Sequence, residues 1–473
     1  MQTKKIGSLS TIILLIFAIA CSLPGQKKTE SDETPSEKMT VAVSLPVGRI
    51  IPEVPLLSDS TLSFALYIPS SYSKKKKSPV LIFFDTQGRG TLPLELYREN
   101  ADHFGYILLC SNNSKNGNPP DFTKHIINNM ILEATSRLSV DSDRVYAGGF
   151  SGGGRIAALS AFMNPVIKGV IGIGAGFPGE QMPVHPFRFI GIARKEDFNY
   201  TELMRLDQQL EINKNPHIFF IYNGKHDWCP ADIIYKAMAL FEFDAMRNKN
   251  IPLNTSLLDE INKTNSSQAS HLKSDQRLME AYKLYQYMLE CGQGLAETTA
   301  VENQIKQLQQ NKNWQKQQQQ MNLLTAEEES LSQKLMQSIG KPLNWWQDEL
   351  NKQFMQITAA PGSEHSYMLK RVLAALSVQC YMIIQQVLYA ADLEKTNYIV
   401  SLYKMVEPEY KDSWYFAAVL DARTGNTQKC YEDLNTAIEK GFNDRNKMLN
   451  ESAFQPLQSE TGFAALLSKI PIR

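Results

Sequence analysis

The feature that most constrains the fold of this chain is the pentapeptide Gly149-Phe150-Ser151-Gly152-Gly153. It follows an apolar run at 144–148, which we expect to be a buried strand, and it precedes an expected helix at 154–163. A G-x-S-x-G sequence at a strand-to-helix turn forms a nucleophile elbow, in which glycines permit a sharp turn that lifts the serine hydroxyl above the sheet edge. We therefore predict that Ser151 is a nucleophile. The backbone N–H of Gly152, at the helix N-terminus, is the predicted donor to an oxyanion.

The first half of the chain alternates short apolar runs, rich in Val, Ile and Phe, with amphipathic stretches. This pattern is typical of a mostly parallel, doubly wound sheet with helices on its faces. Together with the elbow at Ser151, it predicts an α/β fold of the α/β-hydrolase type. We expect strands at 61–68, 79–84, 106–110, 144–148, 169–173, 187–192 and 218–222, the first of them at the sheet edge. We expect helices at 94–104, 121–138, 154–163 and 200–212, and a last one along the apolar stripe from Ile234 to Ala245.

A serine nucleophile requires a general base, and the base requires a group that holds its tautomer. Only one histidine, His226, follows directly on the C-terminal end of a predicted core strand, where active sites of open α/β sheets collect. We therefore predict that His226 is the base. The other histidines have plainer structural interpretations: His103, His125, His185, His217, His271 and His365.

The acid is expected after the preceding strand, because the triad in this fold class follows the chain order Ser, acid, His. Glu196 and Asp197 both lie there, and we favour Asp197. An alternative makes Asp227 the acid and a later histidine, His271 or His365, the base. That alternative requires a further strand after Asp227, and the sequence offers only a helix and a polar segment.

The same residues carry a resemblance to a known family. Residues 61–247 resemble the polyhydroxybutyrate-depolymerase and feruloyl-esterase-like branch of the α/β-hydrolases, and more closely a set of envelope proteins from Bacteroidetes. The matching motifs are Asp-Arg-Val-Tyr at 143–146, Glu-Asp-Phe-Asn-Tyr at 196–200 and Gly-Lys-His-Asp-Trp-Cys-Pro at 224–230. In that family the aspartate before Phe-Asn-Tyr and the histidine before the acidic-Trp pair act with the elbow serine. The resemblance therefore implies the same three residues.

One loop departs from the pattern of many esterases, which place His-Gly and further glycines after the third strand. Here that strand is followed by Asp-Thr-Gln-Gly-Arg-Gly at 85–90. We expect the backbone N–H of Thr86 or Gln87 to serve as the second oxyanion donor. The polar loop 111–117 lies at the same predicted edge, and the sequence leaves open whether it belongs to the site or is a polar turn.

The N-terminus has the pattern of a targeting segment. Lys4 and Lys5 form a basic region, residues 12–20 are an apolar run too short to span a bilayer comfortably, and Ala18-Ile19-Ala20-Cys21 resembles the bacterial lipobox. We expect 1–20 to be a signal peptide and Cys21 to carry the lipid. Residues 22–40 have too few apolar groups to fold, so we expect a flexible tether to the membrane of the cell envelope.

Charge and cysteine usage exclude several classes. Loss of the signal peptide leaves 47 basic against 49 acidic residues, a net charge of −2, which argues against nucleic acid as a partner. None of the cysteines are paired at metal-ligand spacing, so we expect no metal or other cofactor. A single disulfide remains open, without a choice of partners.

The second half is predicted to be helical. We expect the α/β-hydrolase domain at 41–250, a partly Gln-rich helical region at 251–365, which is either a lid or a connector, and a helical domain at 366–473. The stretch from Trp414 to Ile438 resembles a single tetratricopeptide unit. This domain is either a surface that docks a protein partner or a packing appendage.

Two functional hypotheses follow. The first is a lipid-anchored serine esterase that hydrolyses an acyl or aryl ester, such as one carried by a carbohydrate, without a cofactor. The second is a non-catalytic binding or assembly lipoprotein that keeps the hydrolase fold and engages an envelope partner through its helical half.

The lipobox predicts a lipid on the mature N-terminus. Mass spectrometry of the protein from bacterial membranes should show a chain that begins at a lipid-modified Cys21. Cys21→Ser should abolish the modification and release the protein into the soluble fraction. A mature chain that begins elsewhere and carries no lipid would refute the prediction.

Overall fold

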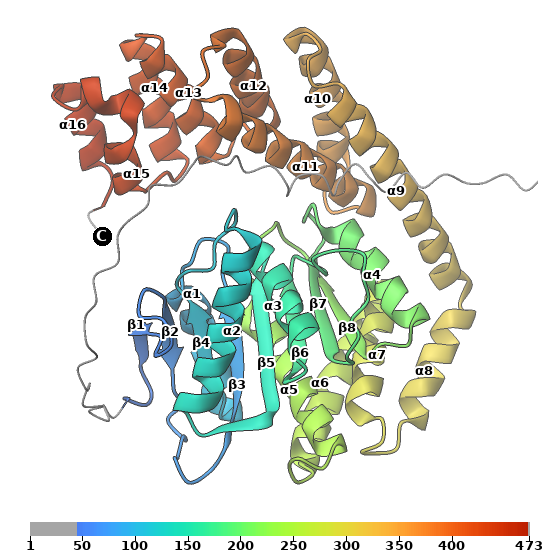
Figure 1. Ribbon diagram of the computed structural model, residues 1–473. Helices are drawn as coiled ribbons and strands as arrows, with labels where there is room; N and C mark the ends of the chain where they lie inside the picture. Colours follow the sequence, from blue (N-terminus) through green and yellow to red (C-terminus); the bar gives the residue numbers. More distant parts are fainter. Residues whose placement is uncertain (1–44, 472–473) are drawn as a thin grey trace, which may run out of the picture.

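The computed structural model describes residues 45–471 (Figure 1). The expected signal peptide, Cys21 and the tether lie outside the described residues. The chain forms a sheet flanked by helices, and a helical part that lies beside one end of that sheet.

The sheet has eight strands in the order β1-β2-β4-β3-β5-β6-β7-β8. β2 runs antiparallel to both β1 and β4, and the remaining neighbours are parallel. The strands are β1 Ile50–Pro55, β2 Ser63–Tyr67, β3 Ser78–Phe84, β4 Ile107–Ser111, β5 Val140–Phe150, β6 Ile167–Ile173, β7 Arg188–Arg194 and β8 His217–Tyr222. The mostly parallel α/β sheet predicted from the sequence is confirmed.

Alternate residues of each central strand enter two different hydrophobic clusters, one on each face of the sheet. In β3, Leu81 and Phe83 face the first cluster, whereas Val80, Ile82 and Phe84 face the second. Successive side chains of a strand point to opposite faces, so burial on both faces requires a continuous apolar run. The apolar runs of the sequence therefore correspond to strands covered by helices on both sides.

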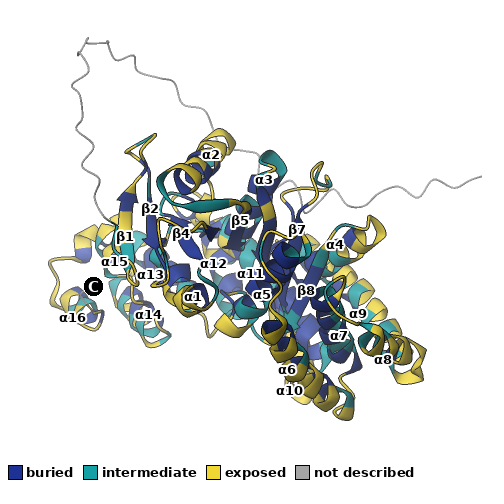
Figure 2. Cartoon of the chain, turned by 90° about the horizontal axis from the view of Figure 1, so that it is seen from below, coloured by how far each residue is buried: buried dark blue, intermediate teal, exposed yellow. Residues whose placement is uncertain are grey.

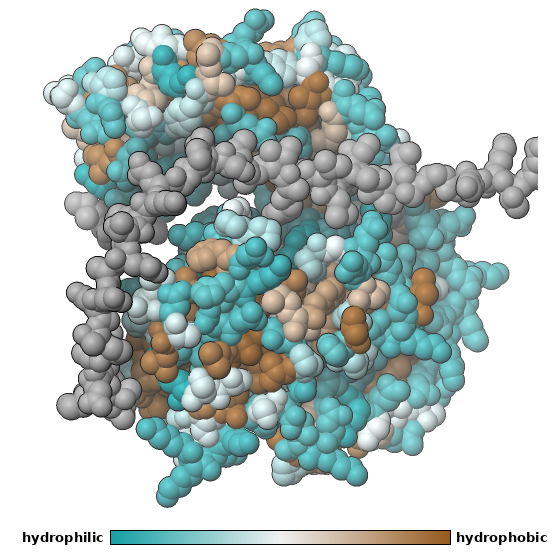
Figure 3. Space-filling view, in the orientation of Figure 1, coloured by the Kyte–Doolittle hydropathy of each residue, from teal (hydrophilic) through white to brown (hydrophobic). Residues whose placement is uncertain are grey.

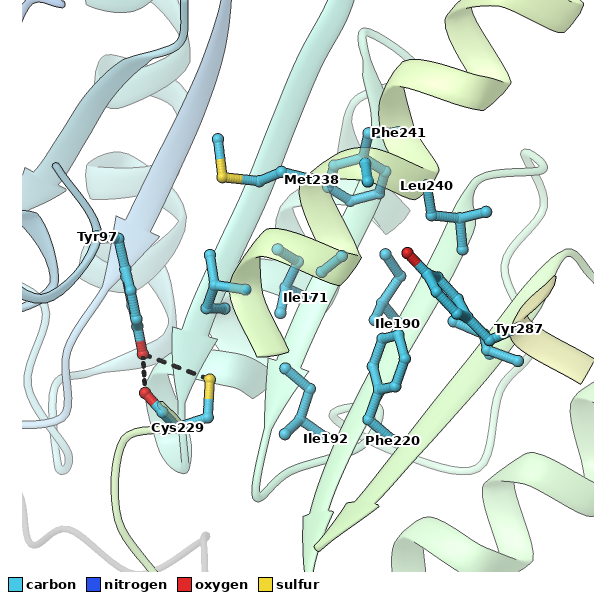
Figure 4. Close-up of a cluster of buried hydrophobic side chains, with 14 of the residues drawn as sticks. Tyr97, Ile171, Ile190, Ile192, Phe220, Cys229, Met238, Leu240, Phe241 and Tyr287 are labelled. Atoms are coloured by element: carbon cyan, nitrogen blue, oxygen red, sulfur yellow. Dashed lines mark hydrogen bonds between the residues drawn. The ribbon is translucent and has the colours of Figure 1, made fainter. Parts of the chain in front are cut away.

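The helices divide between the two faces. Helices α1 Thr91–Phe104 and α5 Ala231–Arg247 pack on the first, and α2 Pro120–Arg137, α3 Gly152–Met163 and α4 Tyr200–Ile212 on the second. Figure 2 shows the central strands mostly dark blue between helices whose outer surfaces are exposed. Figure 4 shows α5 crossing the first face, with Met238 and Phe241 directed toward the sheet that carries Ile171 and Ile190.

The edge of the sheet differs from the prediction. β2 was expected at the edge, but β1 lies outside it and pairs with it from Ile50 to Pro55. The segment Ile-Ile-Pro-Glu-Val-Pro contains two prolines, which are tolerated on edge strands because one side of such a strand needs no hydrogen bonds. Because these prolines interrupt the apolar pattern, the sequence did not predict β1.

The remainder of the chain is helical. The helices are α6 Thr255–Ser274, α7 Leu278–Gly292, α8 Thr299–Gln310, α9 Lys312–Gln337, α10 Leu343–Ala359, α11 Glu364–Val387, α12 Leu393–Val406, α13 Lys411–Arg423, α14 Thr427–Glu439, α15 Arg445–Asn450, the 3-10 helix η2 Ser452–Leu457 and α16 Thr461–Ser468. Apolar residues of α6, α7 and α8 belong to the same cluster as the first face of the sheet. Residues from Leu324 onward form a separate cluster.

Helix α9 joins the two parts of the molecule (Figure 1). Near its start Trp314 packs against the cluster of the sheet, and Leu324 and Leu335 further along belong to the helical cluster. The Gln-rich stretch 304–320 forms the end of α8 and the start of α9, where Gln317 donates a hydrogen bond to the carbonyl of Gln276. That stretch therefore packs beside α7.

Helix α11 is long and apolar enough to cross a membrane by composition alone, but half of that apolar window is buried inside the protein. Leu369, Leu376 and Cys380 of α11 lie in the helical cluster. Figure 3 shows hydrophilic residues predominating on the visible surface, with hydrophobic residues in small groups. Among residues 45–471 the five cysteines are buried and free.

The close contact between β6 and α5 gives a test of the packing. A Cβ added at Gly169 would lie 2.4 Å from Cε1 of Phe241, whose ring stacks on Tyr146 with 4.1 Å between centroids. Gly169→Ala should lower the free energy of unfolding by about 1–3 kcal/mol, because it overpacks a filled core. Urea denaturation measures the change.

Gly179→Ala is the matched control, since a Cβ at Gly179 meets no atom within 4 Å. Its effect should stay within about 0.5 kcal/mol. Equal stabilities for the two variants would contradict the described packing of α5.

Candidate active site

Ser151 sits at the turn between β5 and α3, in a backbone conformation that non-glycine residues rarely adopt. Its φ is 55° and its ψ is −124°. Such a conformation costs about 1–3 kcal/mol and persists only where its surroundings enforce it. The Ser151 N–H donates to the carbonyl of Ile173, 2.8 Å away, and Gly154 N donates to the Ser151 carbonyl at 2.9 Å. The elbow is therefore fixed from both sides, and the half-buried serine stands beyond the end of β5.

The elbow needs glycine at 153 because another backbone passes close by. A Cβ at Gly153 would lie 2.0 Å from the carbonyl oxygen of Phe84, at the end of β3. No side chain fits there, so the first turn of α3 can pack directly on the neighbouring strand. The glycines noted in the sequence thus have a steric reason.

The predicted base and acid meet. His226 Nδ1 lies 2.8 Å from Asp197 Oδ2, and the acid is 1% exposed. Asp197 follows β7, and His226 lies in the loop after β8, so parallel pairing of these strands brings the two residues to the same edge. The other carboxylate oxygen, Oδ1, accepts a hydrogen bond from Asn199 N at 2.8 Å.

This pair lies beside the elbow. A Cβ at Gly174 would be 2.7 Å from Asp197 Oδ2 and 3.1 Å from His226 Cε1, and Gly174 directly follows the residue that accepts the Ser151 N–H. The His226 ring also lies 4.5 Å, centroid to centroid, from Phe150, the residue before the serine. The three predicted residues therefore gather at the carboxyl ends of β5, β7 and β8. Among residues 45–471, no hydrogen bond joins the serine hydroxyl to the histidine in this state, which is common before substrate binds.

Two aromatic rings lie beside His226, and the sequence had not predicted either of them as part of the site. Phe150 and Phe198 lie 4.5 and 4.4 Å from the His226 ring. Both residues are neighbours in sequence of predicted site residues, but adjacency in sequence does not indicate contact between rings, so the sequence offers no signal for this role. Both rings therefore contact the imidazole that pairs with Asp197.

The loop that carries His226 is anchored to helix α1 and to the loop after β3. The Tyr97 hydroxyl of α1 donates to the carbonyl of Cys229 at 2.9 Å (Figure 4). Burial raises the pKa of the Cys229 thiol to about 12, so this cysteine stays a neutral packing residue. Trp228 Nε1 donates to Asp85 Oδ2 at 3.3 Å, which ties the histidine loop to the loop after β3.

Asp85 is a fully buried carboxylate that sequence reasoning treated only as part of a loop. Burial raises its pKa, but hydrogen bonds from the Arg89 side chain and from the backbone of Arg89 and Gln87 outweigh burial, so the pKa lies below its ordinary value. The Arg89 guanidinium contacts both carboxylate oxygens, at 3.0 and 2.8 Å. Asp85 therefore organises the turn that was predicted to complete the oxyanion hole.

In this turn, the two backbone amides predicted as alternative oxyanion donors, Thr86 and Gln87, differ in their hydrogen bonding. The Gln87 N–H donates to Asp85 Oδ1 at 2.9 Å, so it is not available to an oxyanion as predicted. Within residues 45–471 no group accepts from the Thr86 N–H or from the Gly152 N–H, and the latter is one of the unpaired donors at a helix start. Thr86 and Gly152 are thus the free donors at this edge.

The polar loop 111–117 lies against the elbow. Asn116 N donates to the Thr86 carbonyl at 2.9 Å, and a Cβ at Gly152 would lie 2.0 Å from Asn116 Oδ1. Ser114 Oγ donates to the Asp85 carbonyl at 3.0 Å. Of the two interpretations left open, the structure therefore favours a loop that forms part of the site.

The alternative acids and bases are placed elsewhere. Glu196 pairs with Lys370, and the Asp227 carboxylate accepts from the Trp228 N–H. His365 pairs with Glu327, and His271 is an exposed residue of α6.

The strand order, the elbow after β5 and the Asp197–His226 pair after β7 and β8 define an α/β-hydrolase fold. No protein-family model and no curated protein sequence matches the chain.

Similar solved structures are esterases and serine hydrolases. Fluorophosphonate-binding serine hydrolase F of Staphylococcus aureus is 12% identical, over 41% of this chain and 99% of its own, with a TM-score of 0.34. S-formylglutathione hydrolase from the same species is 13% identical over 42% and 99%, with a TM-score of 0.33. A feruloyl esterase module from Clostridium thermocellum is 14% identical over 40% and 86%, with a TM-score of 0.32. Structural similarity at such low sequence identities and TM-scores does not indicate which reaction this chain catalyses.

Gly174 offers a test of the site geometry. Its φ is 60°, and a side chain there would strike Asp197 and His226. Gly174→Ala should slow the reaction of Ser151 with a fluorophosphonate by about 100-fold, because small displacements of catalytic groups are costly.

Gly105→Ala is the control. It has a similar φ of 74°, but its nearest neighbour is Ser71 Oγ at an ordinary 3.7 Å. Both variants should lose stability because each places a side chain at a positive φ, and only Gly174→Ala should lose reactivity. Equal reactivity in the two would argue against the described arrangement.

Proposed function

We propose that this protein is a serine hydrolase that cleaves a carboxylic ester through an acyl-enzyme. The observation that carries the proposal is the 2.8 Å contact between His226 Nδ1 and Asp197 Oδ2, beside a serine held in a strained elbow. A buried acid, an oriented imidazole and a serine at the carboxyl edge of the sheet are the parts that acyl transfer requires.

In the first step His226 Nε2 takes the proton of Ser151 Oγ while Oγ attacks the carbonyl carbon of the ester. Asp197 holds the Nδ1–H and stabilises the imidazolium that forms. The Gly152 N–H and the Thr86 N–H donate to the oxyanion, where fixed donors in a site with little water are most effective. His226 then gives the proton to the departing alcohol oxygen, and the acyl group remains on Ser151.

In the second step a water molecule attacks the acyl-enzyme. His226 accepts a proton from this water, and the same two N–H groups stabilise the second oxyanion. Collapse of the intermediate releases the carboxylic acid and returns the proton to Ser151 Oγ. Side chains and backbone amides of this chain are sufficient for both steps.

The half-buried Phe198 beside His226 offers an apolar surface next to the reacting carbonyl. This supports an acyl or aryl ester as the substrate class, including one attached to a carbohydrate. We propose further that a lipid on Cys21 tethers the enzyme to the bacterial envelope, at the outer membrane, with residues 22–40 as the spacer.

An activity-based fluorophosphonate probe tests the proposal. The full-length protein should be labelled on the peptide that contains Ser151, and Ser151→Ala should not be labelled. His226→Ala should lower the hydrolysis of short p-nitrophenyl esters by about 10⁴-fold or more, because removing the base disables the triad as a unit.

Ser136→Ala, on the exposed face of α2, serves as the control and should behave as the parent protein. Folded protein that is not labelled would instead support a non-catalytic binding protein. Labelling that persists in Ser151→Ala would show that Ser151 is not the nucleophile and would defeat the proposed mechanism.

A further inference from the structure

Helices that follow the sheet in the chain contact the outer side of the loop that carries Asp197. We call residues 195–199, between β7 and α4, the acid loop. Lys195 Nζ lies 2.7 Å from Glu364 Oε1 of α11 and 3.2 Å from Glu280 Oε1 of α7. Glu196 Oε1 accepts from Lys370 Nζ at 2.9 Å. Both residues that precede Asp197 therefore pair with helices that follow the sheet in the chain.

Arg371 makes the most direct of these contacts. This residue of α11 is 3% exposed, and its Nη1 donates to the carbonyl oxygen of Lys195 at 2.8 Å. Its guanidinium also lies 4.4 Å from the centre of the Tyr200 ring, where α4 begins. One planar group thus holds the backbone before Asp197 and the ring just beyond the acid loop.

A buried carboxylate orients Arg371 in turn. Glu328 of α9 accepts from Arg371 Nε at 3.0 and 3.1 Å, and it also accepts from Thr201 Oγ1 at 2.8 Å. A buried ion pair is tolerated only where geometry and hydrogen bonds are nearly complete. The planar fork of arginine satisfies a carboxylate and a carbonyl together, which a lysine does not.

The inner side of the acid loop is held by the sheet. Lys195 N donates to Tyr222 O at 2.9 Å, and Glu196 N donates to Gly224 O at 3.0 Å. These bonds fix the loop along the strands, but they leave its outer side to the helices. Burial lowers the pKa of Lys195, yet Glu364 and Glu280 raise it by more, so the pKa lies above its ordinary value and the side chain stays charged.

We propose that Arg371 is a positioning residue for the reaction proposed above: it holds the acid loop, and through it Asp197, against His226. This inference rests on the proposed function. The helical half would then position a catalytic group. This role differs from both interpretations drawn from the sequence, which were a docking surface and a packing appendage. Asp197 belongs to the sheet domain, and its loop is held in position by α11, whose Arg371 lies more than 170 positions later in the chain than Lys195.

The test compares full-length variants. Arg371→Met removes the donor to Lys195 O but also leaves Glu328 buried without its partner, so it should lower stability as well as activity. The double variant Arg371→Met/Glu328→Gln removes that orphaned charge, and the amide oxygen can still accept from Thr201. Its melting temperature should therefore recover relative to Arg371→Met, while its kcat on p-nitrophenyl acetate should stay about 10- to 100-fold below the parent value, with KM nearly unchanged.

Arg188→Met is the matched control. Arg188 is also a buried residue of β7, it is paired with Asp244 and Glu290, and it lies at the opposite end of the strand. This variant should lose stability and keep its kcat. Arg371→Lys should lie between the parent and Arg371→Met in kcat, because lysine keeps the charge without the fork.

A second readout does not depend on turnover. The parent protein should show a strongly downfield imidazole N–H proton in its NMR spectrum, the signature of the Asp197–His226 hydrogen bond, which Asp197→Asn should remove. The signal should weaken or vanish in Arg371→Met/Glu328→Gln and persist in Arg188→Met. A folded double variant with parental kcat, or with an intact downfield proton, overturns the inference. If the parent has no Ser151-dependent turnover, the proposed function fails, and the proton signal alone decides whether Arg371 positions the acid.

Discussion

Burial of the sheet on both of its faces is the constraint on which the rest of the structure depends. Each central strand sends alternate side chains into one of two apolar clusters, so mainly apolar side chains fill both faces of the sheet. Reactive groups can stand only where the strands end. The serine, the histidine and the aspartate accordingly occupy the turns that follow β5, β8 and β7.

The same constraint explains why the site consists of loops that brace one another. A turn that leaves a buried sheet must satisfy its own backbone groups. Asp85 does this for the turn after β3, and the Trp228 ring N–H links that turn to the histidine loop. Ser114 and Asn116 tie in the loop after β4. The site is therefore held by a continuous set of hydrogen bonds.

Much of this could be predicted from local sequence. Alternation predicted the strand at 61–68, and apolar runs predicted the six later strands, because a strand buried on both faces must be apolar throughout. The elbow glycines indicated Ser151. Chain order then narrowed the acid and base to residues that the structure brings within hydrogen-bonding distance. β1 was missed, because its prolines and its edge position remove the apolar signal.

Other features had no local signal at all. The engagement of the Gln87 amide depends on how the Asp85 carboxylate folds back, which a sequence pattern does not encode. Arg371 lies 176 residues from the carbonyl that it contacts. Contacts of this kind are products of the tertiary fold, so they become visible only when the helices and the sheet are placed together.

Helix α9 has a consequence for how this chain can vary. Its first turns pack on the core of the sheet, its later residues belong to the helical core, and Glu328 lies among these later residues at the acid loop. Each residue inserted into or deleted from a helix rotates the part after the change by about 100° relative to the part before it. In a helix that packs on two cores, this rotation would turn one set of side chains away from its partners. Insertions are therefore far better tolerated in the surface turns than in α9, and the two halves of this protein must evolve as a single unit rather than as exchangeable modules.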